Sequence, residues 1–168
     1  MLIKKALIIV GLGLLIGTTS TRAEDNGLFV TQSLTPETAL MAASAALKKC
    51  QDEGYQVAVA VVDRMGVLQV LLRDRYAGAH TADTARRKAW TATSFRTNTT
   101  EMVEVTQAGQ PQSGVRQISG ALMAGGGMII EAVGSLVGAI GVSGAPGGDL
   151  DDLCAVAGIE AIEDLIAF

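Results

Sequence analysis

The stretch QVAVAVVDRMGVLQVLLRD, residues 56–74, decides the fold class of this 168-residue chain. Two runs of β-branched and aliphatic residues, 57–62 and 67–72, flank a four-residue loop that ends in Gly66, a glycine free to take a positive φ. The pattern therefore predicts a β-hairpin. Asp63, at the start of the loop, is predicted to accept hydrogen bonds from the amides of its own turn.

Helical patterns lie on both sides of this hairpin. Thr35 is a suitable N-cap for a helix that continues to Gly54. Residues 81–95 predict a second helix, with a stripe of alanines that lets it lie close to its neighbour. A shorter helix, capped by residues 99–100, is expected to end near Gly109.

The C-terminal part of the chain repeats this order of elements. Residues 128–133 and 136–142 predict a second pair of strands, and residues 149–165 predict a last helix. The whole pattern indicates an α+β fold with one central antiparallel sheet flanked by helices.

The glycine-rich segment GVSGAPGGD, residues 141–149, joins the last strand to the last helix. It has no lysine for a Walker loop and lacks the spacing of a dinucleotide loop, and aspartates in the next turn would repel a phosphate. We therefore expect the glycines to shape the turn, with a pocket wall or an oligomer contact as a further role. Asp149, Asp151 and Asp152 are expected to cap a solvated helix start, and a metal site built from them is the alternative.

The N-terminal residues 1–23 have the pattern of a signal peptide: a basic start, an apolar run and small residues before Ala23. The apolar run is too short to cross a hydrocarbon core, which needs about 20 apolar residues. We expect cleavage near Ala23, a periplasmic or secreted protein with no stable membrane span, an N-terminal extension at 24–35 and one domain at 36–168.

The charge of the processed chain argues against a nucleic-acid partner. Removing three of the 13 basic residues with the leader, while all 17 acids remain, lowers the net charge from −4 to −7. Nucleic-acid affinity depends mainly on Lys and Arg, so an acidic protein of this kind gains little from a polyanion.

Two cysteines, Cys50 and Cys154, leave the redox state of the chain open. Separate burial of the two thiols on different helices is the preferred interpretation. A disulfide, which an exported protein can keep, would require the helices at the two ends of the domain to pack together.

Four segments of the sequence resemble the GlcG/HbpS family of haem-binding proteins, which is related to the C-terminal domain of the PduO adenosyltransferases. The segments are AVAVVDRMGVLQVLLRD at 58–74, HTADTARRKAWTATSF at 80–95, GGGMII at 125–130 and GAIGVSGAPGGDLDDLCAVAGIEAI at 138–162. The resemblance implies a profilin-like fold, homo-oligomers and, for the extracytoplasmic branch, haem binding with proposed roles in degradation or redox sensing. Met128 stands where many members carry a proline, so the pocket there can differ in shape.

Non-covalent haem b is therefore the expected cofactor, because no CxxCH motif is present for covalent attachment. His80, the only histidine, is the candidate iron ligand. Lys88, Arg73 and Arg87 are candidate partners for the propionates, and Tyr76 is a candidate cover for the pocket.

Structural explanations compete with these assignments. The His80 imidazole could bond Asp83 or the backbone at a helix start, and Arg86 and Arg87 could pair with Asp83 on a solvated face at spacings of three and four. Met65, in the hairpin loop, and Tyr76 are weaker ligand candidates, and Trp90 is more typical of the core.

The sequence thus predicts an exported haem-binding protein that acts as a carrier, a sensor or a factor in haem degradation. The alternative is an oligomeric accessory protein that binds a corrinoid or an organic acid without haem. Enzymatic activity stays open: an enzyme would use Asp63, Arg73 and Lys88, but no nucleophile, paired carboxylate or metal cluster supports that hypothesis from the sequence.

Overall fold

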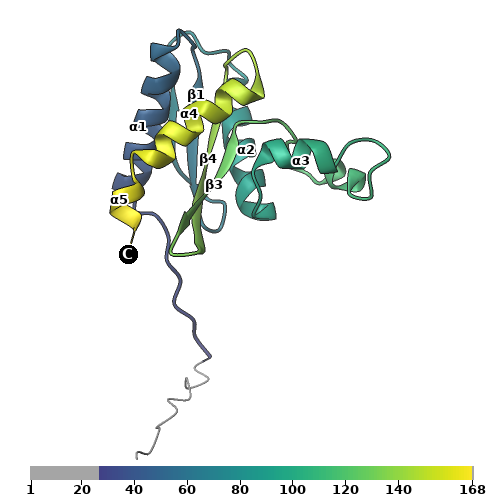
Figure 1. Ribbon diagram of the computed structural model, residues 1–168, viewed down its shortest axis with the longest axis horizontal. Helices are drawn as coiled ribbons and strands as arrows, with labels where there is room; N and C mark the ends of the chain where they lie inside the picture. Colours follow the sequence, from purple (N-terminus) through teal and green to yellow (C-terminus); the bar gives the residue numbers. More distant parts are fainter. Residues whose placement is uncertain (1–26, 168) are drawn as a thin grey trace, which may run out of the picture. The chain divides into compact units, whose positions relative to one another are not determined.

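A four-stranded antiparallel sheet in the order β2-β1-β4-β3 forms the centre of the fold (Figure 1). The computed structural model describes residues 27–167, of which those from Thr31 onward make up one compact unit. The predicted leader at 1–23 and the first residues of the extension lie outside the described residues.

Both predicted hairpins are present. Strands β1 (Ala58–Asp63) and β2 (Leu68–Arg73) form the first, and β3 (Gly127–Ala132) and β4 (Ser135–Ser143) form the second. Pairing of β1 with β4 joins the two hairpins into one sheet. As predicted, the Asp63 carboxylate closes the first turn by accepting hydrogen bonds from the amides of Met65 and Val67 at 2.8 and 2.9 Å.

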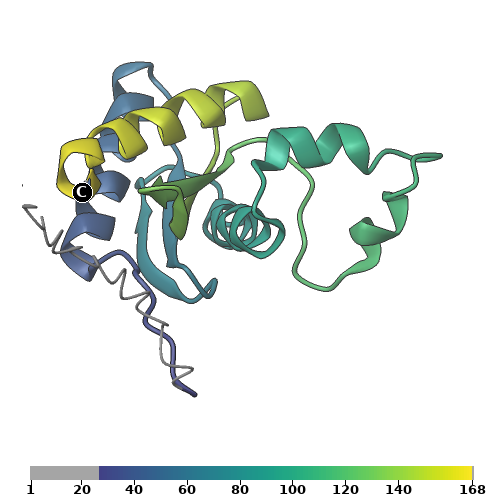
Figure 2. The same cartoon turned by 60° about the horizontal axis from the view of Figure 1, so that its bottom comes forward.

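Helices cover both faces of this sheet, as Figure 2 shows. Helices α1 (Pro36–Asp52) and α4 (Gly148–Glu160) pack on one face, where alternate valines of β1 join the main core. Helix α2 (Thr81–Phe95) packs on the other face through its alanines. The α+β prediction and the alanine stripe are therefore confirmed, as is Thr35, whose side chain accepts a hydrogen bond from the Thr38 amide.

A long excursion, residues 99–124, leaves the sheet between α2 and β3, and we call it the arm (Figures 1 and 2). It contains helix α3 (Thr99–Val105) and a 3-10 turn η1 (Ser113–Gln117). Helix α3 ends four residues earlier than Gly109, the predicted end, because its last carbonyl groups find other donors: Arg116 donates to the Thr106 and Val103 oxygens.

The predicted last helix is also shorter, since α4 ends at Glu160 and a separate turn, α5 (Glu163–Ile166), follows. Among the residues that the structure describes, no helix is long and apolar enough to cross a membrane.

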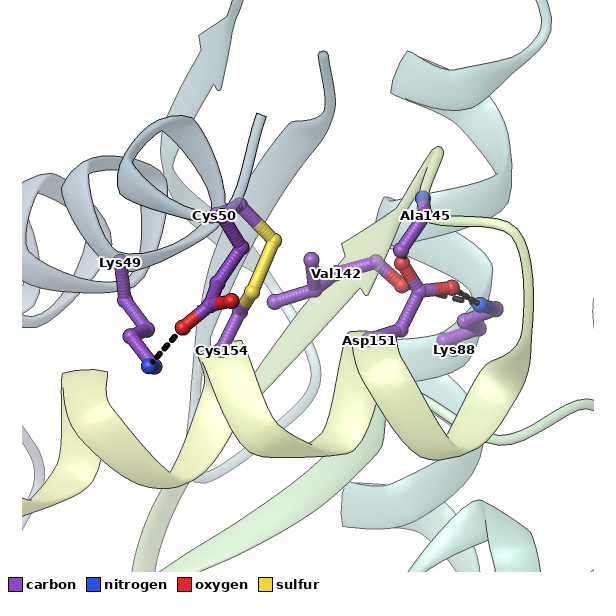
Figure 3. Close-up of a disulfide and its surroundings, with 8 residues drawn as sticks. Lys49, Cys50, Lys88, Val142, Ala145, Asp151 and Cys154 are labelled. Carbon is purple, nitrogen blue, oxygen red and sulfur yellow. Dashed lines mark hydrogen bonds and ion pairs between the residues drawn. A yellow bond between two sulfur atoms is a disulfide. The ribbon is translucent and has the colours of Figure 1, made fainter. Parts of the chain in front are cut away.

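The interpretation of Cys50 and Cys154 as separate thiols is wrong, because the two form a disulfide between α1 and α4 (Figure 3). Their Cα atoms lie 5.5 Å apart although 104 positions separate them in the sequence. The helices approach closely because Gly158 of α4 lies against the Ala42 carbonyl and the Ala46 methyl group of α1. Small residues at the contact thus supply the helix pairing that a bridge requires.

Candidate functional site

A cavity of about 340 Å³ opens where β4 ends and where α2 and α4 begin. Three segments line it: the turn at 78–81, residues 124–125 and the glycine-rich loop at 143–148. The side chains of Gln56, Lys88 and Asp151 complete the lining. Of the five residues predicted to bind haem, His80 and Lys88 lie in its wall, whereas Arg73, Arg87 and Tyr76 do not. The glycine-rich loop, for which a pocket wall was one of the two further roles expected, does line this cavity.

Lys88 reaches the cavity from the buried side of α2 and is only 3% exposed. Its ammonium group lies 2.7 Å from Asp151 Oδ2 and donates a second hydrogen bond to the Val142 carbonyl at 2.9 Å (Figure 3). The buried ion pair therefore fixes α2 to α4 and to the end of β4.

The expectation of a solvated helix start is wrong for Asp151, because this residue is only 3% exposed. Its Oδ1 accepts a hydrogen bond from the Ala145 amide at 3.0 Å, which holds the glycine-rich loop against α4. Burial raises the pKa of the Asp151 carboxyl, and the Lys88 ammonium and the Ala145 amide oppose part of that rise.

Asp152 lies next to Asp151 but does not line the cavity, and it binds the segment that follows Gly125 of the cavity wall. Its Oδ1 accepts a hydrogen bond from the Gly126 amide at 2.6 Å, and its Oδ2 accepts one from the Thr100 hydroxyl. Asp149 alone of the three aspartates is exposed as predicted. No cluster of three or more His, Cys, Asp or Glu side chains suited to a metal exists in the described part of the chain, so the alternative of a metal site at these aspartates finds no support there.

His80 stands at the N-terminal end of α2 with its side chain exposed. The structural explanation holds in part: His80 is the N-cap residue of α2. The hydrogen bond it expected is not present, since the imidazole bonds neither Asp83 nor any other group between residues 27 and 167, and Asp83 pairs with Arg86 at 2.7 Å instead. An unpartnered imidazole beside a cavity is available to a ligand or a metal.

The other three predicted residues lie elsewhere. Arg73 donates to the Ala77 carbonyl, and Arg87 donates to the carbonyl groups of Gly120 and Ala121 at the return of the arm. Arg87 thus does not pair with Asp83, which corrects half of the expected pairing. Tyr76 is 79% exposed outside the cavity wall.

Two further candidates lie outside the site. Met65 is exposed in the hairpin loop. Trp90 is half-buried, and its indole faces Gly66 and Gly120, which gives it a packing role. The enzyme hypothesis gains nothing from the geometry, because Lys88 lines the cavity while Asp63 and Arg73 do not.

Comparison with known proteins agrees with this architecture. A family model described as "Haem degrading protein HbpS-like" matches residues 34–160. The chain belongs to this family. The resemblance predicted from the four sequence segments is therefore confirmed.

Solved structures extend the HbpS-like match over nearly the whole fold. A double mutant of HbpS from Streptomyces reticuli is 39% identical with a TM-score of 0.76, and the match covers 87% of this chain and 98% of that one. A complex of PduOC with heme is 29% identical with a TM-score of 0.72, and covers 77% of this chain and 95% of that one.

A curated relative is much longer than the HbpS-like chain. The corrinoid adenosyltransferase PduO of Salmonella typhimurium is 33% identical over 102 residues, which cover 60% of this chain and 30% of that enzyme. The match thus spans less than a third of PduO.

Sequence reasoning missed Asp151, which lines the cavity of this HbpS-like chain, and Asp152, which binds the neighbouring Gly126 amide. A run of acids at a helix start is common on solvated surfaces, and the Lys88 partner lies 63 positions away from Asp151. Lys88 and Asp151 meet only in the folded protein, where α2 and α4 pack on opposite faces of the sheet. No local signal marks this pair.

A second cavity, of about 210 Å³, lies between the entry to α1, the β3–β4 turn and α5. Its wall is mainly apolar and includes Leu34, Val137 and Ile166. It contains no titratable side chain, so it offers neither an iron ligand nor a cation.

Proposed function

We propose that this protein binds haem b non-covalently and that His80 would hold the iron. The observation that carries the proposal is the single histidine of the chain, unpartnered within the described residues and placed in the wall of the cavity that also contains Lys88. Membership of a family described as haem degrading, and the likeness to a PduOC complex with heme, support the same ligand.

The residues present fit the group at two points. His80 offers an imidazole nitrogen to the iron, and the Lys88 ammonium offers a cation to a propionate, provided that the propionate shares it with Asp151. Gly125 and the glycine-rich loop at 143–148 let a flat ligand approach the backbone. Bound haem would supply the redox-active iron that degradation or sensing requires, whereas a carrier needs only the site.

We propose a homo-oligomer because the cavity is incomplete for a macrocycle. Its volume of about 340 Å³ is at the lower end of the roughly 300–1,000 Å³ typical of ligand pockets. A porphyrin held at His80 would extend beyond it, so an apolar cover from a second copy of the chain would complete the site.

The N-terminal pattern supports export to the periplasm or the medium, with cleavage near Ala23 and the division into a leader at 1–23, an extension at 24–35 and a domain at 36–168. The Cys50–Cys154 disulfide is compatible with that location, because such bonds persist in oxidising compartments.

A second candidate is a site for a small organic acid without haem. The cavity wall favours it, since apart from Ala124, Ala145 and Pro146 the lining consists of glycines and polar or charged residues. A carboxylate could enter beside Lys88 without the wide apolar slot that a porphyrin needs.

A hemin titration of residues 24–168, followed at the Soret band, tests both candidates. We expect saturable binding that is lost in His80→Ala and kept in Met65→Leu, a control at another candidate ligand. Saturable binding with an unchanged spectrum in His80→Ala would refute the ligand assignment. Absence of binding by the unaltered chain would refute the haem proposal and favour the organic acid.

A further inference from the structure

We propose that the Ser143 hydroxyl and the first turn of α4 form a binding site for one carboxylate group of the ligand in the 340 Å³ cavity. Only the source of that group, a propionate of haem or a free organic acid, rests on the proposed function above. Lys88 alone does not explain recognition of an acid. Asp151 neutralises its charge, and two of its three ammonium protons are already donated to Asp151 and the Val142 carbonyl.

The Ser143 side chain is buried in the cavity wall without a hydrogen-bond partner. Ser143 ends β4, is 5% exposed and lines the cavity. Since Val142 belongs to the main core on one face of the sheet, the next side chain points to the other face, where Lys88 also lines the cavity. Among the described residues, the only fully enclosed side-chain polar atom without a partner is Gln69 Oε1. The Ser143 hydroxyl, which bonds no group between residues 27 and 167, is therefore open to the cavity.

The first turn of α4 presents backbone amides to the same cavity. Gly147 is the N-cap residue, and no side chain caps the helix. The amides of Gly148 and Asp149 therefore have no acceptor among the described residues, and Gly147 and Gly148 line the cavity. A Cβ atom at position 148 would lie 2.9 Å from the Gly125 Cα, so this wall has room only for backbone. A carboxylate in the cavity can thus accept hydrogen bonds from these amides directly.

Asp151 keeps the loop between these two groups of donors in place. Its Oδ1 accepts a hydrogen bond from the amide of Ala145, which lies in the loop between Ser143 and Gly147 (Figure 3). Its Oδ2 pairs with Lys88, so the loop is anchored to α2 as well as to α4. The hydroxyl and the amides are therefore positioned before a ligand arrives, which lowers the entropic cost of binding.

The neighbouring charges favour a carboxylate over a phosphate. Lys88 and Asp151 cancel each other, whereas Asp149 is exposed in the first turn of α4 and adds a negative charge beside the free amides. A phosphate dianion would be repelled more strongly than a group with a single charge. A carboxylate has that single charge and two acceptor oxygens, which match a hydroxyl and a pair of amides.

Sodium propionate tests the site without haem, in a nitrogen-15 NMR titration of residues 24–168. We expect saturable shifts of the amides of Gly147, Gly148 and Asp149, with sodium chloride at equal ionic strength as the reference and weaker binding of sodium phosphate. Ser143→Ala should weaken propionate binding by about 10-fold, the range of a hydrogen bond to a charged group. The control Ser135→Ala, at an exposed serine outside the cavity wall, should leave the affinity unchanged.

Two outcomes would overturn the proposal: no shifts at the start of α4, or equal affinities in Ser143→Ala and the unaltered chain. Ser143→Ala removes no hydrogen bond within residues 27–167, so its melting temperature without ligand should not fall. Asp149→Asn removes the neighbouring charge and should strengthen propionate binding by roughly 2–5-fold. If Ser143→Ala proves unstable, Asp149→Asn still decides, because unchanged or weaker binding in that variant would overturn the proposal.

Hemin and its dimethyl ester distinguish the two sources of the carboxylate. The ester keeps the porphyrin and the iron but has no ionised acid. If the site holds a haem propionate, hemin should bind about 10-fold more tightly than the ester, and Ser143→Ala should weaken the binding of hemin alone. Equal binding of hemin and ester, with propionate binding intact, would assign the site to a free organic acid. If neither porphyrin binds, the haem proposal fails, while the propionate titration still decides the carboxylate site.

Discussion

At the scale of single residues, the buried Lys88–Asp151 pair is the contact whose loss should matter most. Both partners are 3% exposed, so removing one leaves an uncompensated charge in a poorly solvated place. We expect Lys88→Met to lower the free energy of unfolding by about 3–5 kcal/mol. Urea denaturation at neutral pH measures this loss.

The double variant Lys88→Met/Asp151→Leu is the matched control for that prediction. It removes both charges, so it should recover most of the stability that Lys88→Met loses. A double variant as unstable as the single one would show that packing around Lys88, and not its charge, carries the effect.

The raised pKa of Asp151 gives this loss a pH dependence. A carboxyl that binds its proton more tightly when folded contributes stability that is fully present below its ordinary pKa of 3.8 and is lost as the pH rises through the folded pKa. The Lys88 ammonium limits the rise in pKa, so its removal raises the pKa of Asp151 further. The destabilisation by Lys88→Met should therefore be smaller near pH 4 than near pH 7.5.

Urea denaturation at several pH values checks this trend. Lys48→Met, which breaks an exposed pair with Asp52, serves as the control because exposed pairs contribute little at any pH. A destabilisation by Lys88→Met that is constant from pH 4 to pH 7.5 would contradict the burial of an ionised Asp151.

At the scale of elements, the close approach of α2 to β4 is set by one glycine. A Cβ atom on Gly141 would collide with the Ala85 carbonyl and approach the Ala89 amide. Gly141→Ala should therefore push the helix from the sheet and lower stability by about 1–3 kcal/mol, as overpacking does. Thermal unfolding measures the change against Gly114→Ala, a control at which an added Cβ atom meets nothing within 4 Å. An effect no larger than that of the control would contradict the prediction.

The sequence predicts elements well where their signals are local. Alternation and a glycine-containing turn indicate the first hairpin, Thr35 and Pro36 indicate the start of α1, and the alanine stripe indicates the contact face of α2. Contacts between elements are different. The Cys50–Cys154 bond and the Lys88–Asp151 pair join positions 104 and 63 residues apart, and a sequence pattern gives no measure of which helix faces meet.

The candidate site shows the same limit. His80 and Lys88 could be named because a lone histidine and a lysine in a family motif are visible in the chain. The sequence does not show that Arg73 and Arg87 lie outside the site. Their guanidinium groups bind backbone carbonyl groups, and no sequence pattern indicates such a contact. The role of Asp151 depends on burial, which an acidic run at a helix start conceals.

At the scale of the whole molecule, the disulfide joins the first and the fourth helices. It closes a loop of about 100 residues, and loss of such a bond typically costs about 2–5 kcal/mol. We expect the variant Cys50→Ala/Cys154→Ala to lose stability within that range, measured by urea denaturation against the oxidised protein. Equal midpoints for the two proteins would contradict this expectation.

The position of that bond also determines what a single backbone cleavage would do. A protease acting on the exposed polar tip of the arm, around Gln107–Gln112, would separate a fragment that carries β1 and β2 from one that carries β3 and β4. The cysteines lie on opposite sides of the cut, so the fragments would stay covalently joined through α1 and α4. The chain is in this sense built as two complementary halves with one covalent link. Under denaturing conditions a nicked molecule would migrate as a single species until a reductant breaks the disulfide.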